Sequence, residues 1–522
     1  MLRLAQTRIW LLPLSIVGGA ALSLFVLSYW IDASQARSPV HALSLVFHPN
    51  PQAAATTLSN AAEVTAAVLG VALTVVAIVV ELASNRYTHR VTELFVSEPR
   101  NFLVMGLFVV TALQGMWVSL TFDYDPQHGG FVPYTGIGLA MLLLTLCLLV
   151  LLPYFNFVFA FLNPIQIVGR IYKHTLVAIE RAGKHVETAQ AEAVRGVDQI
   201  GDVALNAMQG RDKGVSISAV DALRALWTGY QGVRPRLPDA WFEVGGELAH
   251  NADFVSMDPA VLAELSARRL WLEMKILRQY QTVFGEALGI RVRDVAYVVA
   301  INTRLMAEEA ARAGHDALLR MAIKFFNTYL RAAISGDDVR TAYSVSHQYR
   351  LLAQALLERD QGPLVVEIAH HLHYYGQVAY SAGLPFILET VAYDLCTLNE
   401  VAHARGGPAR DELLYIFLTV DKEGDGDAHE ASLRGVRKAQ IKLATYFLLQ
   451  GDEPRARRIQ LDMANEDRGR LSSIHDELLR VETADYWEIT DRGVNFDYLA
   501  PERKQKLAEF FGWFEPGARA TR

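Results

Sequence analysis

The chain has 522 residues, which is too long for one simple hydrophobic core and predicts two or more domains. Its formal net charge of −7 and its pI near 6.1 exclude a strongly basic surface, so we expect no nucleic acid among its partners. The sequence has two cysteines, Cys147 within an apolar run and Cys396 in the charged remainder of the chain. Two cysteines placed in this way do not form a disulfide framework.

The first 165 residues contain four apolar runs of about the length, roughly 20 residues, that lets a helix cross a bilayer. These runs cover residues 9–31, 61–82, 102–122 and 133–162. We therefore predict a membrane domain over residues 1–165 with four transmembrane helices and the lipid bilayer as its surroundings. The first run is about twice as long as the apolar part of a signal peptide, which favours a retained helix over a leader cleaved near Ala36.

Basic residues near the ends of these runs predict an N-in, C-in topology. Arginines stand before the first run and between the second and third, and Lys and Arg follow the fourth. The other two connections hold one basic residue, Arg37. On this pattern the protein is a multi-pass protein of the cell inner membrane, and its large C-terminal part is cytoplasmic.

Small residues are more frequent than polar ones in the apolar runs. Glycines such as Gly70, Gly106 and Gly115 allow membrane helices to approach closely. This composition predicts a tightly packed anchor. The alternative is a pore formed by a homo-oligomer, because hydroxyl groups and backbone can line a channel without charged side chains.

Residues 60–225 resemble a bacterial family of predicted inner-membrane proteins of unknown function. The resemblance rests on Ala83-Ser84-Asn85-Arg86-Tyr87-Thr88-His89-Arg90, which follows the second run, and on Asp202-Val203-Ala204-Leu205. The family continues with Asn-Asp-Pro, where this chain has Arg211-Asp212-Lys213. The resemblance implies the membrane topology and a short interfacial helix before the third span, and it implies no activity.

Beyond residue 165 the apolar residues recur at helical spacing, so we predict an all-α protein. We expect a helical connector over 166–240, a cytoplasmic helical-repeat domain over 241–480 and an aromatic-rich cap over 481–522. The repeat domain is predicted to be solenoid-like and tetratricopeptide-like. Its clearest helical hairpin spans residues 438–466, with Ala439 and Ala444 on the packed face and the turn at Gly451-Asp452.

The cap carries many aromatic side chains for a chain end, among them Phe496, Phe510 and Trp513. They indicate either a terminal helix pinned to the repeat domain or a latch that docks another subunit.

Glu-x-x-His occurs three times, as Glu247/His250, Glu367/His370 and Glu400/His403. Two such pairs on neighbouring helices are how helical di-metal sites present their ligands. Glu367, His370, Glu400 and His403 are therefore candidate ligands of a divalent metal. A carboxylate and an imidazole on one helix face also pair without a metal. The Glu-x-x-His motif could equally indicate a packing position that recurs in the helices.

Asp421, Glu423, Asp425 and Asp427 imitate the first half of a calcium-binding loop, with Gly426 at its sixth position. The twelfth position, which should be a bidentate Glu, is Ser432. The alternative to a calcium site is a solvated acidic turn.

The nucleotide-binding, hydrolase and redox motifs that carry a recognisable mechanism are absent from the sequence. We therefore predict a non-enzymatic membrane protein whose cytoplasmic helical domain serves assembly or the binding of a protein partner. We expect a homo-oligomer and no cofactor. The alternatives are a homo-oligomeric channel and a metal-binding sensor or enzyme built on the Glu-x-x-His pairs.

Overall fold

The computed structural model of the protein describes residues 51–86, 90–96, 98–120, 123–125, 129–131, 134–183, 185–421, 427–485, 492–493 and 495–514. The chain divides into two compact units, Met1–Arg170 and Ile171–Arg522, which are described separately below. We call them the membrane unit and the helix stack.

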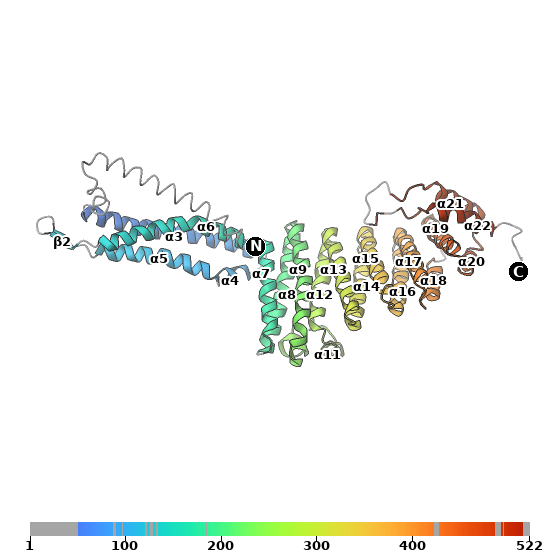
Figure 1. Ribbon diagram of the computed structural model, residues 1–522, viewed down its shortest axis with the longest axis horizontal. Helices are drawn as coiled ribbons and strands as arrows, with labels where there is room; N and C mark the ends of the chain where they lie inside the picture. Colours follow the sequence, from blue (N-terminus) through green and yellow to red (C-terminus); the bar gives the residue numbers. More distant parts are fainter. Residues whose placement is uncertain are drawn as a thin grey trace. The chain divides into compact units, whose positions relative to one another are not determined.

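The membrane unit contains the helices α3 (Pro51–Arg86), α4 (Arg90–Val96), α5 (Pro99–Leu120) and α6 (Tyr134–Phe161) (Figure 1). Within the described residues, three helices are long and apolar enough to cross a membrane: Thr56–Asn85, Pro99–Leu120 and Leu139–Phe161. They correspond to the second, third and fourth predicted spans. The first predicted span, residues 9–31, lies outside the described residues, so the structure supports three of the four spans. The short α4 stands where the family resemblance implies an interfacial helix.

Close packing in the membrane unit depends on Gly115, as the sequence predicts for its small residues. A Cβ atom added there would lie 3.1 Å from the Cβ of Ala62 on α3. The hydroxyl of Thr111 and the thiol of Cys147 are 3.1 Å apart and join α5 to α6. Gly70 and Gly106 have open space around them instead. A three-residue antiparallel pair, β1 (Asp123–Asp125) with β2 (Gly129–Phe131), interrupts the otherwise helical chain.

The helix stack is built from consecutive helical hairpins (Figure 1). Its main helices are α8 (Val186–Gln209), α9 (Lys213–Val233), α12 (Trp271–Gly289), α13 (Arg293–Arg312), α14 (Asp316–Ser335), α15 (Val339–Leu357), α16 (Gly362–Ser381), α17 (Pro385–Arg405), α18 (Arg410–Leu418) and α19 (Asp427–Leu449). The shorter or flanking elements are the part of α7 (Pro164–Glu180) that follows Arg170, and η1 (Arg234–Arg236), η2 (Asp239–Phe242), α10 (Gly246–Ala249), α11 (Pro259–Ala267), α20 (Glu453–Asp462), α21 (Arg468–Arg480) and α22 (Pro501–Gly512).

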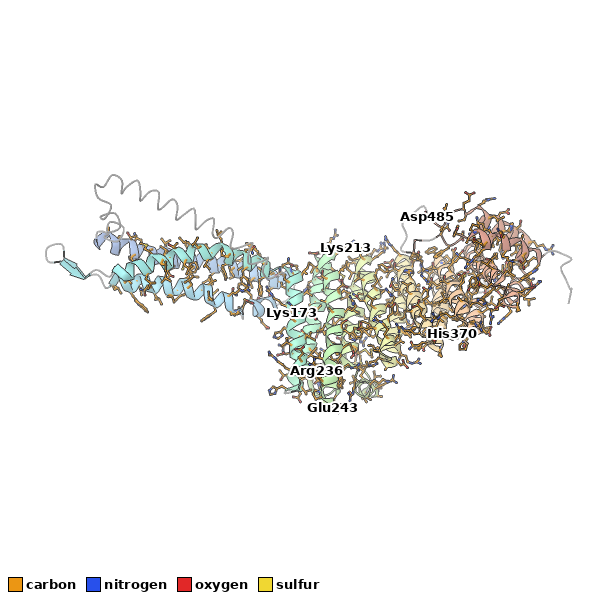
Figure 2. All side chains as sticks on the ribbon, viewed as in Figure 1. Lys173, Lys213, Arg236, Glu243, His370 and Asp485 are labelled. Atoms are coloured by element: carbon orange, nitrogen blue, oxygen red, sulfur yellow. The ribbon has the colours of Figure 1, made fainter. Side chains whose placement is uncertain are left out.

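The hairpins align so that their helices form two rows. In the odd-numbered row, α9, α13, α15, α17 and α19 each contact the next. In the even-numbered row, α8, α12, α14, α16 and α18 do the same. Figure 2 shows Lys213, at the start of α9, and Arg236, in η1 just after the end of α9, at opposite edges of the stack. Each helix buries its apolar stripe between its hairpin partner and the neighbouring hairpins, which is the packing of a helical-repeat protein.

The turns between these helices recur every 46 residues. The backbone is left-handed at Arg291, Asp337 and Gly383 within three hairpins, and at Gly314, Asp360 and Gly406 between hairpins. In the first set, the N–H of the residue that follows the left-handed one donates to the carbonyl oxygen of an alanine at the end of the preceding helix. The N···O distances are 2.8, 3.0 and 2.9 Å. Only some of these positions are glycine, although a side chain in this conformation costs about 1 kcal/mol or more. The positions of glycine in the sequence therefore do not by themselves reveal the 46-residue period.

A 46-residue unit corrects the tetratricopeptide-like prediction, because the tetratricopeptide unit has about 34 residues. The helical hairpin predicted over 438–466 is nevertheless present, as α19 and α20. Ala439, Ala444, Ala456 and Ile459 are buried in it, and Gly451 forms its turn with a φ of 79°.

Replacing Gly451 by alanine is expected to lower the stability of the stack by about 1 kcal/mol, because the new Cβ must be held in the left-handed region. Gly285→Ala is the matched control. Gly285 lies inside α12 with open space around it and no positive φ, so alanine there should stabilise the helix by about 1 kcal/mol. The thermal unfolding midpoints of the two purified variants should move in opposite directions.

Candidate partner-binding face on the odd-numbered helices

Polar side chains join three successive pairs of neighbouring helices along the odd-numbered row, from α9 to α17. In each of these bridges an arginine Nε lies at hydrogen-bond distance from an amide or carboxylate oxygen of the next helix. The bridges are Arg224 to Asn302 at 2.8 Å, Arg304 to Gln348 at 2.8 Å and Arg350 to Asp394 at 3.0 Å. The acceptors stand at residues 302, 348 and 394, one per 46-residue unit. The row therefore carries a repeated polar position that is buried between neighbouring helices.

The third bridge differs from the other two because its acceptor carries a charge. Asp394 is 1% exposed and pairs with a second arginine, Arg492, which is itself 4% exposed. Both carboxylate oxygens of Asp394 accept from the Arg492 guanidinium, one of them from Nη2 at 3.0 Å. Arg492 also lies over the ring of Tyr343 on α15, with 4.5 Å between the guanidinium carbon and the ring centroid. A buried carboxylate thus attracts a cation that neutral Asn302 and Gln348 do not require.

Arg492 belongs to a segment that crosses α15, α17 and α19. We call residues 492–493 and 495–500 the strap. Phe496 of the strap stacks on Tyr393 of α17, with centroids 4.5 Å apart and an interplanar angle of 10°. Asp497 accepts hydrogen bonds from the Tyr393 hydroxyl at 2.8 Å and from Lys438 Nζ at 2.7 Å.

The strap backbone is held as well as its side chains. Lys442 of α19 donates to the carbonyl oxygens of Phe496 at 3.0 Å and Tyr498 at 3.1 Å. Hydrogen bonds to backbone carbonyls add affinity whatever the side chains are, and contacts with particular side chains add specificity. The strap therefore lies on the odd-numbered row as a turn-containing segment, in which the Tyr498 N–H donates to the Asn495 carbonyl at 3.2 Å.

The aromatic chain end continues from the strap into α22. Phe510 is buried and packs against Phe511, Trp513 and Phe514, and the guanidinium of Arg457 on α20 lies 3.6 Å from the Trp513 ring centroid. Of the two predicted roles, the described residues show aromatic side chains packed against the end of their own stack. The docking of another subunit stays a prediction.

Glu389 on α17 lies beneath the strap and has an unusual protonation equilibrium. Burial and the nearby Asp497 carboxylate raise the pKa of Glu389 to about 7, and Lys438 opposes this shift. Gly435 of α19 leaves the room for this side chain, since a Cβ there would come within 2.4 Å of its Cγ.

Ionisation of Glu389 is expected to weaken the stack as pH rises from about 4.5 through about 7. The folded pKa is raised, so the stabilising form is the neutral acid, present in full below the ordinary pKa and lost above the folded one. The total loss is about 3 kcal/mol. Glu389→Gln should flatten this dependence between pH 5 and 8 in thermal unfolding. An unchanged pH profile in the variant would contradict the assignment.

The predicted metal ligands have other partners in the structure. Glu367 Oε2 accepts from Arg320 of α14 at 2.7 Å, and His370, half exposed on the surface of α16, lies 3.9 Å from Glu412 of α18 (Figure 2). On α17, Glu400 accepts from both terminal nitrogens of Arg503, at 2.7 and 2.9 Å. His403 Nε2 lies 3.1 Å from Asp452. The contacts join neighbouring helices of the stack.

Across the described part of the chain, no group of three or more His, Cys, Asp or Glu side chains is arranged to hold a metal ion. Glu367 and His370 lie on the even-numbered row, whereas Glu400 and His403 lie on the odd-numbered row. In the third pair, His250 Nδ1 lies 2.8 Å from the Gly246 carbonyl oxygen. We expect elemental analysis of the purified protein to find no stoichiometric iron, manganese or zinc; one metal ion per chain would restore the di-metal hypothesis.

The predicted calcium loop falls largely outside the described residues. Glu423 and Asp425 lie there, and Asp427 is described only as the first residue of α19. Asp421 is described, and its carboxylate pairs with Arg437 at 2.9 Å. The calcium site stays a prediction.

One charged cluster that the sequence analysis missed joins α8 to α12. Lys275 of α12 is 1% exposed, and its ammonium group contacts Asp198 of α8 at 2.5 Å, Asp253, and the Asn251 amide oxygen at 3.0 Å. Gln279 donates to Asp198 at 2.8 Å. Burial is the main cause of a raised pKa for Asp198, and Lys275 lowers that pKa. The sequence feature that pointed to this cluster is the segment around Asp202, which resembles the family. Asp198 lies one helical turn before Asp202.

A model of the family described as predicted membrane protein, DUF2254, matches residues 6–214. The match covers α3 to α8 and ends at the start of α9, and it confirms the predicted resemblance to an uncharacterised membrane protein family. No curated protein matches the chain. A solved circular tandem repeat protein, described as having novel repeat topology and enhanced subunit contact surfaces, is 16% identical over 89% of this chain and 96% of its own, with a TM-score of 0.25. A score of that size carries no conclusion about fold or function.

Proposed function

We propose that this protein is a membrane-anchored interaction protein whose helix stack binds a partner protein on the odd-numbered row. Three apolar helices and the match to a membrane protein family support the anchor. The observation that carries the binding role is the occupied end of the row, where α15, α17 and α19 hold the strap through its side chains and backbone. A stack of hairpins offers the same kind of face over several units.

The part of the row that the strap leaves uncovered has the composition of a binding face. On α13, Val298, Ile301 and Leu305 are half-buried at helical spacing, beside Tyr297 and Arg304. Protein interfaces commonly combine apolar contacts with tyrosine and arginine at their centre. We propose this α13 surface as the partner contact.

The side of the membrane follows from the basic residues of the connections. We propose that the stack is cytoplasmic in the cell inner membrane, because Lys and Arg gather on the connections that share its side. Reporter fusions after residues 50, 98, 130 and 183 should alternate in compartment, with the fusion after 183 cytoplasmic. A fusion after 183 that reports the opposite compartment would reverse the proposal.

A photo-crosslinking residue at position 301 tests partner binding in cells. We expect an adduct of defined mass from position 301, and none from the matched position 324, which is exposed on the even-numbered row at α14. An adduct of twice the chain mass would identify the partner as a second copy. Equal labelling at both positions, or labelling at neither, would refute binding on this face.

A further inference from the structure

The strap site has features of a recognition site beyond those needed to close the end of a stack. Its central group, Asp394, is a buried carboxylate at the position where the two preceding units carry the neutral Asn302 and Gln348. One arginine from the preceding helix satisfies each neutral acceptor. At Asp394 that arginine, Arg350, is present as well, and Arg492 is added. The extra charge therefore serves the strap and not the bridge between helices.

The strap site contacts three side chains of the strap. Asp394 and the Tyr343 ring bind the arginine at the first position. The Tyr393 ring stacks on an aromatic residue four positions later. The Tyr393 hydroxyl and Lys438 bind the carboxylate that follows it. Lys442 donates to the carbonyl oxygens of Phe496 and Tyr498, in a turn that the Tyr498 N–H closes by donating to the Asn495 carbonyl at 3.2 Å, and this contact requires no particular side chain.

We propose that the strap site also binds, from a separate protein chain, a turn-forming segment with an arginine, an aromatic residue four positions on and an acid directly after it. In the absence of such a segment, the strap occupies the site. This inference rests on the proposed partner-binding function and names the chemistry of one partner. A tethered segment has an effective concentration in the millimolar range, so the strap excludes weak competitors and yields to a tight or concentrated one.

The test uses a fluorescent peptide with the sequence of residues 492–499 and the full chain in detergent. Wild-type protein should bind the peptide weakly, because its own strap competes. Arg492→Ala removes the strap anchor while Arg350 still pairs with Asp394, and we expect the peptide to bind that variant at least tenfold more tightly. Phe496→Ala releases the strap by a second route and should give the same direction of change.

Two controls separate recognition from loosened structure. The double variant Arg492→Ala/Asp394→Asn should lose the gain in affinity, as should a peptide with alanine in place of its arginine. Equal binding by the single and double variants, or no binding by either released variant, would overturn the inference. Crosslinking at position 301 does not depend on the strap, so a failure here leaves the proposed function to its own test.

Discussion

Replacing Asp394 by asparagine is expected to release the strap and to destabilise the stack by about 3 kcal/mol, because the guanidinium groups of Arg350 and Arg492 lose the carboxylate that they share. Asparagine restores the neutral acceptor found at residues 302 and 348, so the bridge from Arg350 should persist while the contact with Arg492 fails. The thermal unfolding midpoint should fall, and limited proteolysis should cut the chain near its C-terminal end sooner.

Arg405→Ala is the matched control for the Asp394 variant. Arg405 is an exposed arginine that donates to the Glu358 carbonyl at 2.7 Å, and its loss should change stability by no more than about 0.5 kcal/mol. Wild-type proteolysis in Asp394→Asn would show that the arginine pair does not hold the strap.

Replacing Lys275 by methionine should cost about 4 kcal/mol, because Asp198 and Asp253 are then left without the buried cation that pairs with both. Methionine has a similar length and fills the space, so the loss reports charge and not a cavity. The expected result is a large fall in the thermal unfolding midpoint of the purified protein.

A neutralised cluster distinguishes charge imbalance from a packing defect. In Lys275→Met/Asp198→Asn/Asp253→Asn the cation and both carboxylates are removed together, and most of the lost stability should return, since a neutral replacement of a buried ion group is often tolerated. If the triple variant is less stable than Lys275→Met, the carboxylates contribute through contacts other than the lysine.

Local sequence patterns predicted the helices well. The apolar runs 61–82, 102–122 and 133–162 correspond to α3, α5 and α6, because a bilayer-spanning helix needs a continuous apolar stretch that is visible without any partner. Beyond residue 165, the apolar residues at helical spacing within 316–336, 338–362 and 384–407 fall in α14, α15 and α17. Their apolar spacing and their caps are local properties.

The candidate site was much less accessible to such reasoning. The same Glu-x-x-His motif contains Glu367 with His370 and Glu400 with His403. The first pair lies on the even-numbered row of helices and the second pair on the odd-numbered row. A spacing of three residues places two side chains on one helix face and says nothing about which neighbouring helix that face meets. The 46-residue period was also difficult to detect in the sequence. Glycine is the usual residue in a left-handed turn, but of the three equivalent positions only Gly383 is a glycine, and the other two are Arg291 and Asp337.

The sequence by itself determined the membrane helices, the all-helical character of the remainder and the family resemblance, because each follows from residues close together along the chain. Only the tertiary structure decided that Arg492 meets Asp394 and that Lys275 meets Asp198, pairs separated by 98 and 77 residues. No pattern of spacing marks these pairs, since the partners are chosen by how the hairpins stack. Burial of a charge then makes each pairing necessary, because an isolated ion inside the stack would cost several kcal/mol.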